Sequence, residues 1–166
     1  MVLVDTSVWI EGIRRAGRLE VKVGLESLLE AYEACWCGPV KLEVLGGART
    51  QERRSLAMWF ACVPYRPMTD AAWESAKELF WRLRDRGQTV PWNDVLIASL
   101  ALAWDCRVYA LDRHFDVMKE VVGLRLYAPG YGGKYQPEPR PCGSGRRGPS
   151  PITAPGPLAH ARGSAD

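Results

Sequence analysis

Short apolar runs alternate with longer stretches of mixed polarity along the first 130 residues. The apolar runs predict buried strands at residues 2–4, 35–37, 107–111 and 124–128. The stretches between them carry apolar residues at helical spacing and predict helices over 8–15, 19–34, 40–48, 51–63, 71–86, 91–105 and 114–122. Strands that alternate with helices in this way favour an α/β domain with a mostly parallel sheet.

Hydroxyl residues mark the expected starts of three helices. Thr6 and Ser7 offer a cap for the first helix, Thr50 for the helix over 51–63, and Thr69 for the helix over 71–86. Such side chains accept a hydrogen bond from a backbone N–H that the first helical turn leaves without a partner. We therefore expect each of these helices to begin directly after its hydroxyl residue.

Two aspartates directly follow predicted strands. Asp5 comes after the strand at 2–4, and Asp112 comes after the strand at 107–111. In open parallel sheets, ligands bind at the carboxyl ends of the strands. Both carboxylates are therefore expected where that rule places an active site.

Four acidic residues stand in locally apolar surroundings: Asp5, Glu43, Asp94 and Asp112. Taken singly, three of them fit helix caps or a helix N-terminal acid, and Glu43 fits a half-exposed helix position. Taken together in one cleft, four carboxylates would repel one another and bind protons. A hard divalent cation removes that penalty, and ligands that are all oxygen atoms suit Mg²⁺ or Mn²⁺. Sequence spacing alone leaves open whether the four meet in space.

The positive charge of the chain lies outside its foldable part. Residues 1–130 carry seventeen basic and seventeen acidic side chains, so the formal charge of +3 belongs to residues 131–166. That last segment holds seven prolines and seven glycines, and such a composition cannot bury enough apolar surface to fold. We therefore predict one folded domain over 1–130 and a disordered tail over 131–166. The basic balance is no argument that the domain binds nucleic acid.

The chain shows no membrane or export signal in its pattern. Its longest apolar run, 95–104, is about half of the ~20 residues that cross a bilayer. No basic lead-in precedes an apolar segment at the N-terminus, so we expect a cytoplasmic protein with no membrane contact. Five cysteines without CxxC spacing and only two histidines argue against a Cys/His zinc site.

Four stretches of sequence between residues 1 and 127 carry a specific order of motifs. They are VLVDTSVWIE, GPVKLEVLGGAR, LRDRGQTVPWNDVLIASLALAWDCRVYALDRHFD and VVGLRLY. The order D-T-S, E-V-L-x-G-A, D-x-L-I-A and L-D-x-x-F, with these separations, resembles the PIN-domain ribonucleases. Within that family it is most similar to the VapC-type toxins of bacterial and archaeal toxin–antitoxin pairs.

The resemblance implies a three-layer α/β/α sandwich with a mostly parallel central sheet and an acidic cluster that binds Mg²⁺ or Mn²⁺ and cuts RNA. Position by position, the catalytic acids are expected to be Asp5, Glu43, Asp94 and Asp112. The first, third and fourth of these are the expected metal ligands, with Glu43 acting directly or through water. Hydrolysis by metal-activated water leaves a 3′-hydroxyl and a 5′-phosphate.

The same resemblance implies supporting residues and one departure. Thr6 or, in preference, Ser7 falls on the small hydroxyl residue that supports the first aspartate. The family often carries a second acid where this chain has His114. Asp112 is therefore expected to act alone there or with help from Asp116.

Several cationic and aromatic residues are candidates for RNA binding. Arg82 and Arg86 are four residues apart and share a helix face, and Arg113 adjoins Asp112. Trp92, close to Asp94 in sequence, is a candidate for stacking on a base. Trp9 has the helical spacing of a core residue and is expected to be buried.

The resemblance also implies two protein partners, a second copy of the chain in a homodimer and a small antitoxin that enters the cleft. Two rival interpretations remain. One is a catalytically weak PIN-fold module that binds RNA or a protein partner. The other is a phosphohydrolase with Asp5 as nucleophile, which expects a second aspartate two residues on, where this chain has Ser7.

Overall fold

The computed structural model describes residues 1–130, and the predicted tail over 131–166 lies outside the described residues. The elements are β1 (Val2–Val4), α1 (Thr6–Ile13), α2 (Leu19–Glu30), β2 (Ala34–Cys37), α3 (Gly38–Gly46), α4 (Arg53–Phe60), β3 (Tyr65–Arg66), α5 (Asp70–Asp85), α6 (Trp92–Ala103), β4 (Arg107–Tyr109) and α7 (His114–Val122). Strands and helices alternate along the chain, as the hydrophobic pattern predicts.

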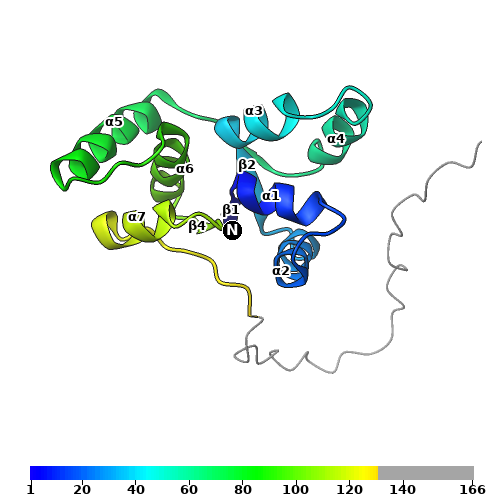
Figure 1. Cartoon of the computed structure of the whole chain (residues 1–166). Helices are drawn as coiled ribbons and strands as arrows, with labels where there is room; N and C mark the ends of the chain where they lie inside the picture. The colour runs from blue at the N-terminus through cyan, green and yellow to red at the C-terminus, as the bar shows by residue number, and fades with distance from the viewer. Residues whose placement is uncertain (131–166) are drawn as a thin grey trace, which may run out of the picture. The chain divides into compact units, whose positions relative to one another are not determined.

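The strands of the described part form one parallel sheet in the order β3-β2-β1-β4. β1 is central: Val2 pairs with Ala34 of β2, and Leu3 pairs with Val108 of β4. Figure 1 shows α5, α6 and α7 on one side of the strands and α1, α2 and α4 on the other. The fold is a three-layer α/β/α sandwich with a parallel sheet, as predicted.

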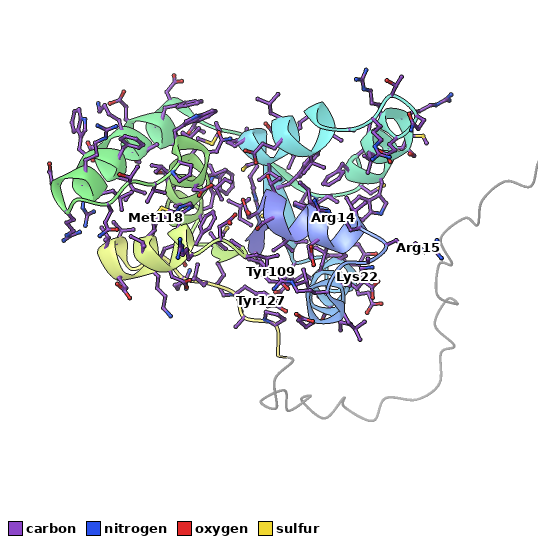
Figure 2. All side chains as sticks on the ribbon, viewed as in Figure 1. Arg14, Arg15, Lys22, Tyr109, Met118 and Tyr127 are labelled. Atoms are coloured by element: carbon purple, nitrogen blue, oxygen red, sulfur yellow. The ribbon has the colours of Figure 1, made fainter. Side chains whose placement is uncertain are left out.

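The core lies between the sheet and its helices. β1 and β2 are buried along their whole length, and α6 is buried from Val95 to Ala101. Trp9 of α1 is fully buried, as expected; its indole N–H donates to the carbonyl of Val4 at 3.0 Å, so the ring loses no hydrogen bond on burial. The ring of Tyr109 in β4 and the ring of Tyr127, near the end of the described chain, contact edge to face (Figure 2).

The predicted capping residue is confirmed for one helix and is wrong for two. Thr69 caps α5 and accepts a hydrogen bond from the N–H of Ala72 at 3.2 Å. The first helix is capped by Asp5 instead of Thr6 or Ser7, because Asp5 is the last residue with extended backbone and accepts from the N–H of Ser7. Thr50 caps nothing: a turn at 49–52 intervenes, and α4 begins only at Arg53.

The expected strands also need two corrections. Tyr65–Arg66 forms β3 although Pro64 and Pro67 flank it, which is tolerated because β3 is an edge strand. The run at 124–128 is no full strand. It makes a single bridge, Leu126 to Val108, in the parallel sense beside β4. In residues 1–130, no helix has both the length and the apolar character needed to cross a membrane.

Candidate active site

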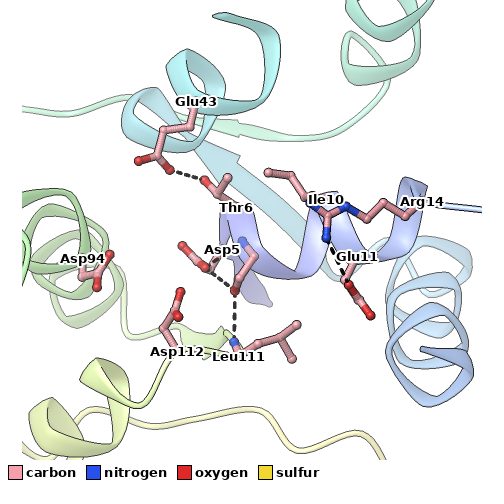
Figure 3. A pocket seen from close by; sticks show the side chains of 10 residues that line it. Asp5, Thr6, Ile10, Glu11, Arg14, Glu43, Asp94, Leu111 and Asp112 are labelled. Carbon is pink, nitrogen blue, oxygen red and sulfur yellow. Dashed lines mark hydrogen bonds and ion pairs between the residues drawn. The ribbon is translucent and has the colours of Figure 1, made fainter. Parts of the chain in front are cut away.

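The four acidic residues singled out by sequence line one open cavity of about 550 Å³. They come from four elements: Asp5 follows β1, Glu43 lies on α3, Asp94 lies in the first turn of α6, and Asp112 follows β4. β1 and β4 are parallel neighbours, so their carboxyl ends lie at the same edge of the sheet. Figure 3 shows Asp5, Asp94 and Asp112 turned toward one another with Glu43 above them.

Asp5 forms the deep edge of the cavity and is only 3% exposed. One of its carboxylate oxygens accepts hydrogen bonds from the backbone N–H of Ser7 at 2.9 Å and from the Ser7 hydroxyl at 2.5 Å. The same hydroxyl accepts from the N–H of Leu111 at 3.1 Å, which ties Asp5 to the loop that carries Asp112. Ser7, and not Thr6, is thus the hydroxyl residue that contacts Asp5.

Burial raises the pKa of Asp5 above its ordinary value, and the hydrogen bonds from Ser7 offset part of that rise. The pKa of Asp94 is also raised, to about 6, by burial together with the nearby Asp5 carboxylate. Asp112 adds to this repulsion, whereas His114 opposes it. The acids are therefore close enough to repel one another.

His114 lies beside Asp94. Its Nδ1 is 2.9 Å from a carboxylate oxygen of Asp94. The resemblance leads one to expect a second acid at this position. In this chain the histidine there is instead a partner for Asp94. The sequence shows the substitution but gives no sign of this contact, because the two residues are on different helices.

Glu43 forms the outer edge of the cavity on the exposed side of α3. The hydroxyl of Thr6 donates to its Oε2 at 2.5 Å, and the side-chain amide of Asn93 donates to its Oε1. Thr6 therefore supports Glu43, whereas the resemblance suggested a role beside Asp5. Asn93 was not predicted, since nothing in the sequence connects residues that lie 50 positions apart.

The oxygen donors of this cavity suit a hard divalent cation by their chemistry, although the side chains are not placed to share one in this structure. All four side chains offer carboxylate oxygens. Burial, and next the nearby Asp5 carboxylate, raise the pKa of Asp94, and a bound cation would offset both effects. As the side chains stand, no group of three or more His, Cys, Asp or Glu residues within 1–130 has the mutual geometry to hold a metal ion. Asp5, Asp94 and Asp112, with Glu43 beside them, are the residues that would hold it.

Only some of the arginines that could bind RNA lie at the cavity. Arg14 of the α1 C-cap lines the cavity, and Figure 2 shows it beside Arg15 and Lys22. Arg82 and Arg86 do not line it. Their guanidinium groups donate to the carbonyl of Val121 at 3.5 and 3.2 Å, at the last turn of α7.

The other predicted residues lie near the cavity but do not line it. Arg113 and Asp116 are exposed at the start of α7. Trp92 opens α6 two positions before Asp94 and is 59% exposed. Its ring is accessible for stacking.

The sequence matches the family model of the PIN domain over residues 2–121. This match covers most of the chain and all four acidic positions. The chain belongs to the PIN-domain family.

Named relatives and solved structures agree with that assignment. The chain is 32% identical over 130 residues to Ribonuclease VapC11 of Mycobacterium tuberculosis, which covers 75% of this chain and 96% of that protein. VapBC2 from Rickettsia felis, crystallised with a DNA fragment from its promoter, is similar with a TM-score of 0.64 at 20% identity, covering 76% of this chain and 98% of that one. A toxin–antitoxin complex from Klebsiella pneumoniae is similar with a TM-score of 0.60 at 17% identity, covering 78% and 98%. The two structures share the fold of this chain.

Proposed function

We propose that this protein is a metal-dependent endoribonuclease, the toxin component of a type II toxin–antitoxin pair, which hydrolyses RNA phosphodiester bonds in the cytoplasm. One observation carries the proposal: four carboxylates from four separate elements line a single open cavity at the carboxyl end of the sheet. The PIN family match and the relatives that are named VapC ribonucleases support the same reaction class.

The cofactor of this proposal is Mg²⁺ or Mn²⁺, held by Asp5, Asp94 and Asp112. When bound, such an ion supplies Lewis-acid activation of a water molecule and of the scissile phosphate. The protein contributes the geometry. Ser7 fixes the Asp5 carboxylate by two hydrogen bonds, and the Nδ1 of His114 contacts the carboxylate of Asp94.

The substrate would enter along the open side of the cavity. Arg14, whose side chain is 67% exposed, lines that opening and offers a phosphate contact. Trp92 offers an exposed ring for an unpaired base beside Asp94. The Trp92 ring suits single-stranded RNA better than a duplex, because a base must leave its helix before it can stack on the ring.

Two protein partners belong to the proposal. A small antitoxin would silence the enzyme, as the names of the structural neighbours VapBC and toxin–antitoxin complex suggest for those proteins. A homodimer would cover exposed apolar side chains such as Leu42 and Trp73, which are 69% and 51% exposed.

The test is to incubate the antitoxin-free protein with total RNA, once with Mg²⁺ and once with a chelator, and to map the ends of the fragments. We expect cleavage only with the ion, and 3′-hydroxyl and 5′-phosphate ends. An Asp94→Asn protein from the same preparation controls for contaminating nuclease. Fragments with 2′,3′-cyclic phosphate ends, or equal cleavage in the chelator, would contradict the proposed chemistry.

A further inference from the structure

We propose that Asn93, together with Thr6, is a positioning residue that holds Glu43 in the catalytic cavity. This inference deepens the proposed function and rests on it. Glu43 lies on an exposed helix face, so packing does not fix its carboxylate. Two donors from other elements fix it instead.

The two donors reach the carboxylate from separate helices. The hydroxyl of Thr6, at the start of α1, donates to Oε2, and the amide of Asn93, at the start of α6, donates to Oε1. Each oxygen of Glu43 thus has its own neutral donor. These two hydrogen bonds fix the position of the carboxylate without adding a charge to the cavity.

The orientation of the Asn93 amide is set by the hydrogen bond that its nitrogen donates to Glu43, because its oxygen makes no hydrogen bond within the described residues. Its Oδ1 is buried and has no hydrogen-bond partner within the described residues. A buried carbonyl without a partner is unfavourable, and turning the amide round would set that oxygen against the negative charge of Glu43. The bond to Glu43 therefore selects the orientation.

Both donors are neighbours of cavity acids in the sequence. Thr6 follows Asp5 directly, and Asn93 precedes Asp94 directly. Glu43 is consequently tied on one side to the strand end that carries Asp5 and on the other to the helix that carries Asp94. Residues that orient metal-ligating carboxylates in this way are important because loss of the contact costs affinity and rate.

The experiment is a double-mutant cycle in the full-length protein. Single-turnover RNA cleavage and the dissociation constant for Mn²⁺, from titration calorimetry, are measured for wild type, Asn93→Ala, Glu43→Ala and the double variant. We expect Asn93→Ala to slow cleavage and to weaken Mn²⁺ binding, each by roughly 10-fold, with RNA affinity unchanged. In the Glu43→Ala background, Asn93→Ala should change neither quantity.

Two substitutions at Thr6 test the second donor. Thr6→Ser keeps the hydroxyl and should retain cleavage near the wild-type rate, whereas Thr6→Val keeps the shape, loses the donor and should behave like Asn93→Ala. Thr69→Ala removes a helix cap far from the cavity and controls for a general loss of stability. It should leave both readouts unchanged.

The outcomes separate the inference from the function on which it rests. If Asn93→Ala has the same effect with and without Glu43, or no greater effect than Thr69→Ala, Asn93 does not act through Glu43 and the inference fails. If Asp94→Asn cleaves RNA as fast as wild type, the proposed active site fails. The Mn²⁺ titrations would then still report whether Asn93 acts through Glu43.

Discussion

The two edges of the cavity hold their carboxylates by opposite means. Asp5, at the deep edge, is buried, and its position is fixed by the strand end and by Ser7, two residues away. Glu43, at the outer edge, lies on an exposed helix face and is held by donors 37 and 50 positions away. Burial restricts the conformation of an acidic side chain but disfavours its charged form. Exposure leaves the charged form hydrated but leaves the side chain free to change conformation.

This difference concentrates the electrostatic strain at the deep edge. The pKa values of Asp5 and Asp94 are raised, first by burial and, at Asp94, next by repulsion from Asp5. Without a bound ion, these buried carboxylates are unfavourable. The acids that serve the reaction therefore lower the stability of the metal-free fold. Substitutions at the deep edge should therefore change activity and stability in opposite directions.

The largest expected effect is on the reaction at the deep edge. Asp94→Asn keeps the shape of the side chain but removes a ligand charge, and we expect it to lower the single-turnover cleavage rate by ~10³-fold or more. The measurement is cleavage of a defined RNA in Mg²⁺ by matched preparations.

Circular dichroism on the same samples checks that Asp94→Asn is folded, and metal-free Asp94→Asn should be at least as stable as wild type. An Asp94→Asn protein that cuts at the wild-type rate would remove Asp94 from the site. A variant that is inactive because it fails to fold would contradict the account of strain at this edge.

The second effect is on the pH dependence of stability. Asp94 has an ordinary pKa of 3.8, and its folded pKa is about 6, so between these values the folded protein binds a proton that the unfolded chain releases. This contribution is complete below pH 3.8 and is lost as the pH rises through 6. Metal-free protein should therefore lose on the order of 1–2 kcal/mol between about pH 5 and pH 7.5.

Thermal unfolding in chelator at the two pH values measures that loss, which corresponds to a midpoint lower by roughly 5 °C at the higher pH. Asp94→Asn should flatten the dependence, because the titrating group is gone. Added Mn²⁺ should raise the midpoint at pH 7.5 by binding only the folded state. If wild type and Asp94→Asn have the same pH dependence of stability, the titration of Asp94 does not cause that dependence.

The smallest expected effects are on KM for RNA, and they differ between an arginine that lines the cavity and one that does not. Arg14→Ala removes a cation from the cavity opening, and we expect KM for RNA to rise about 3-fold with kcat unchanged, since exposed phosphate contacts are individually weak. Arg86→Ala removes a hydrogen bond to the last turn of α7 and should change KM less than Arg14→Ala does. Steady-state cleavage of the same RNA by both variants tests this, and a reversed order would move the RNA path toward α5.

Much of the fold follows from local patterns. Continuous apolar runs locate β1, β2 and β4. Asp5 and Asp112 directly follow two of the predicted strands, which predicts that both face one cavity, although β4 ends three residues before Asp112. These inferences hold because a strand buried on both faces has a continuous apolar sequence and because parallel strands end at a common edge.

The features that the sequence does not reveal depend on contacts between distant residues. The role of Asn93 requires α3 and α6 to be brought together, and the pairing of His114 with Asp94 requires α6 and α7. β3 is hidden by its flanking prolines, which only an edge position tolerates. Thr50 fails as a cap because the backbone turns once more before α4 begins.

The most direct test of the whole account is a crystal soaked in Mn²⁺, with anomalous diffraction data used to locate the ion. The account predicts an anomalous peak in the cavity with carboxylate oxygens of Asp5, Asp94 and Asp112 at coordination distance, about 2.0–2.4 Å. A soaked crystal with no peak among these side chains, or with the ion bound elsewhere in the domain, would contradict it.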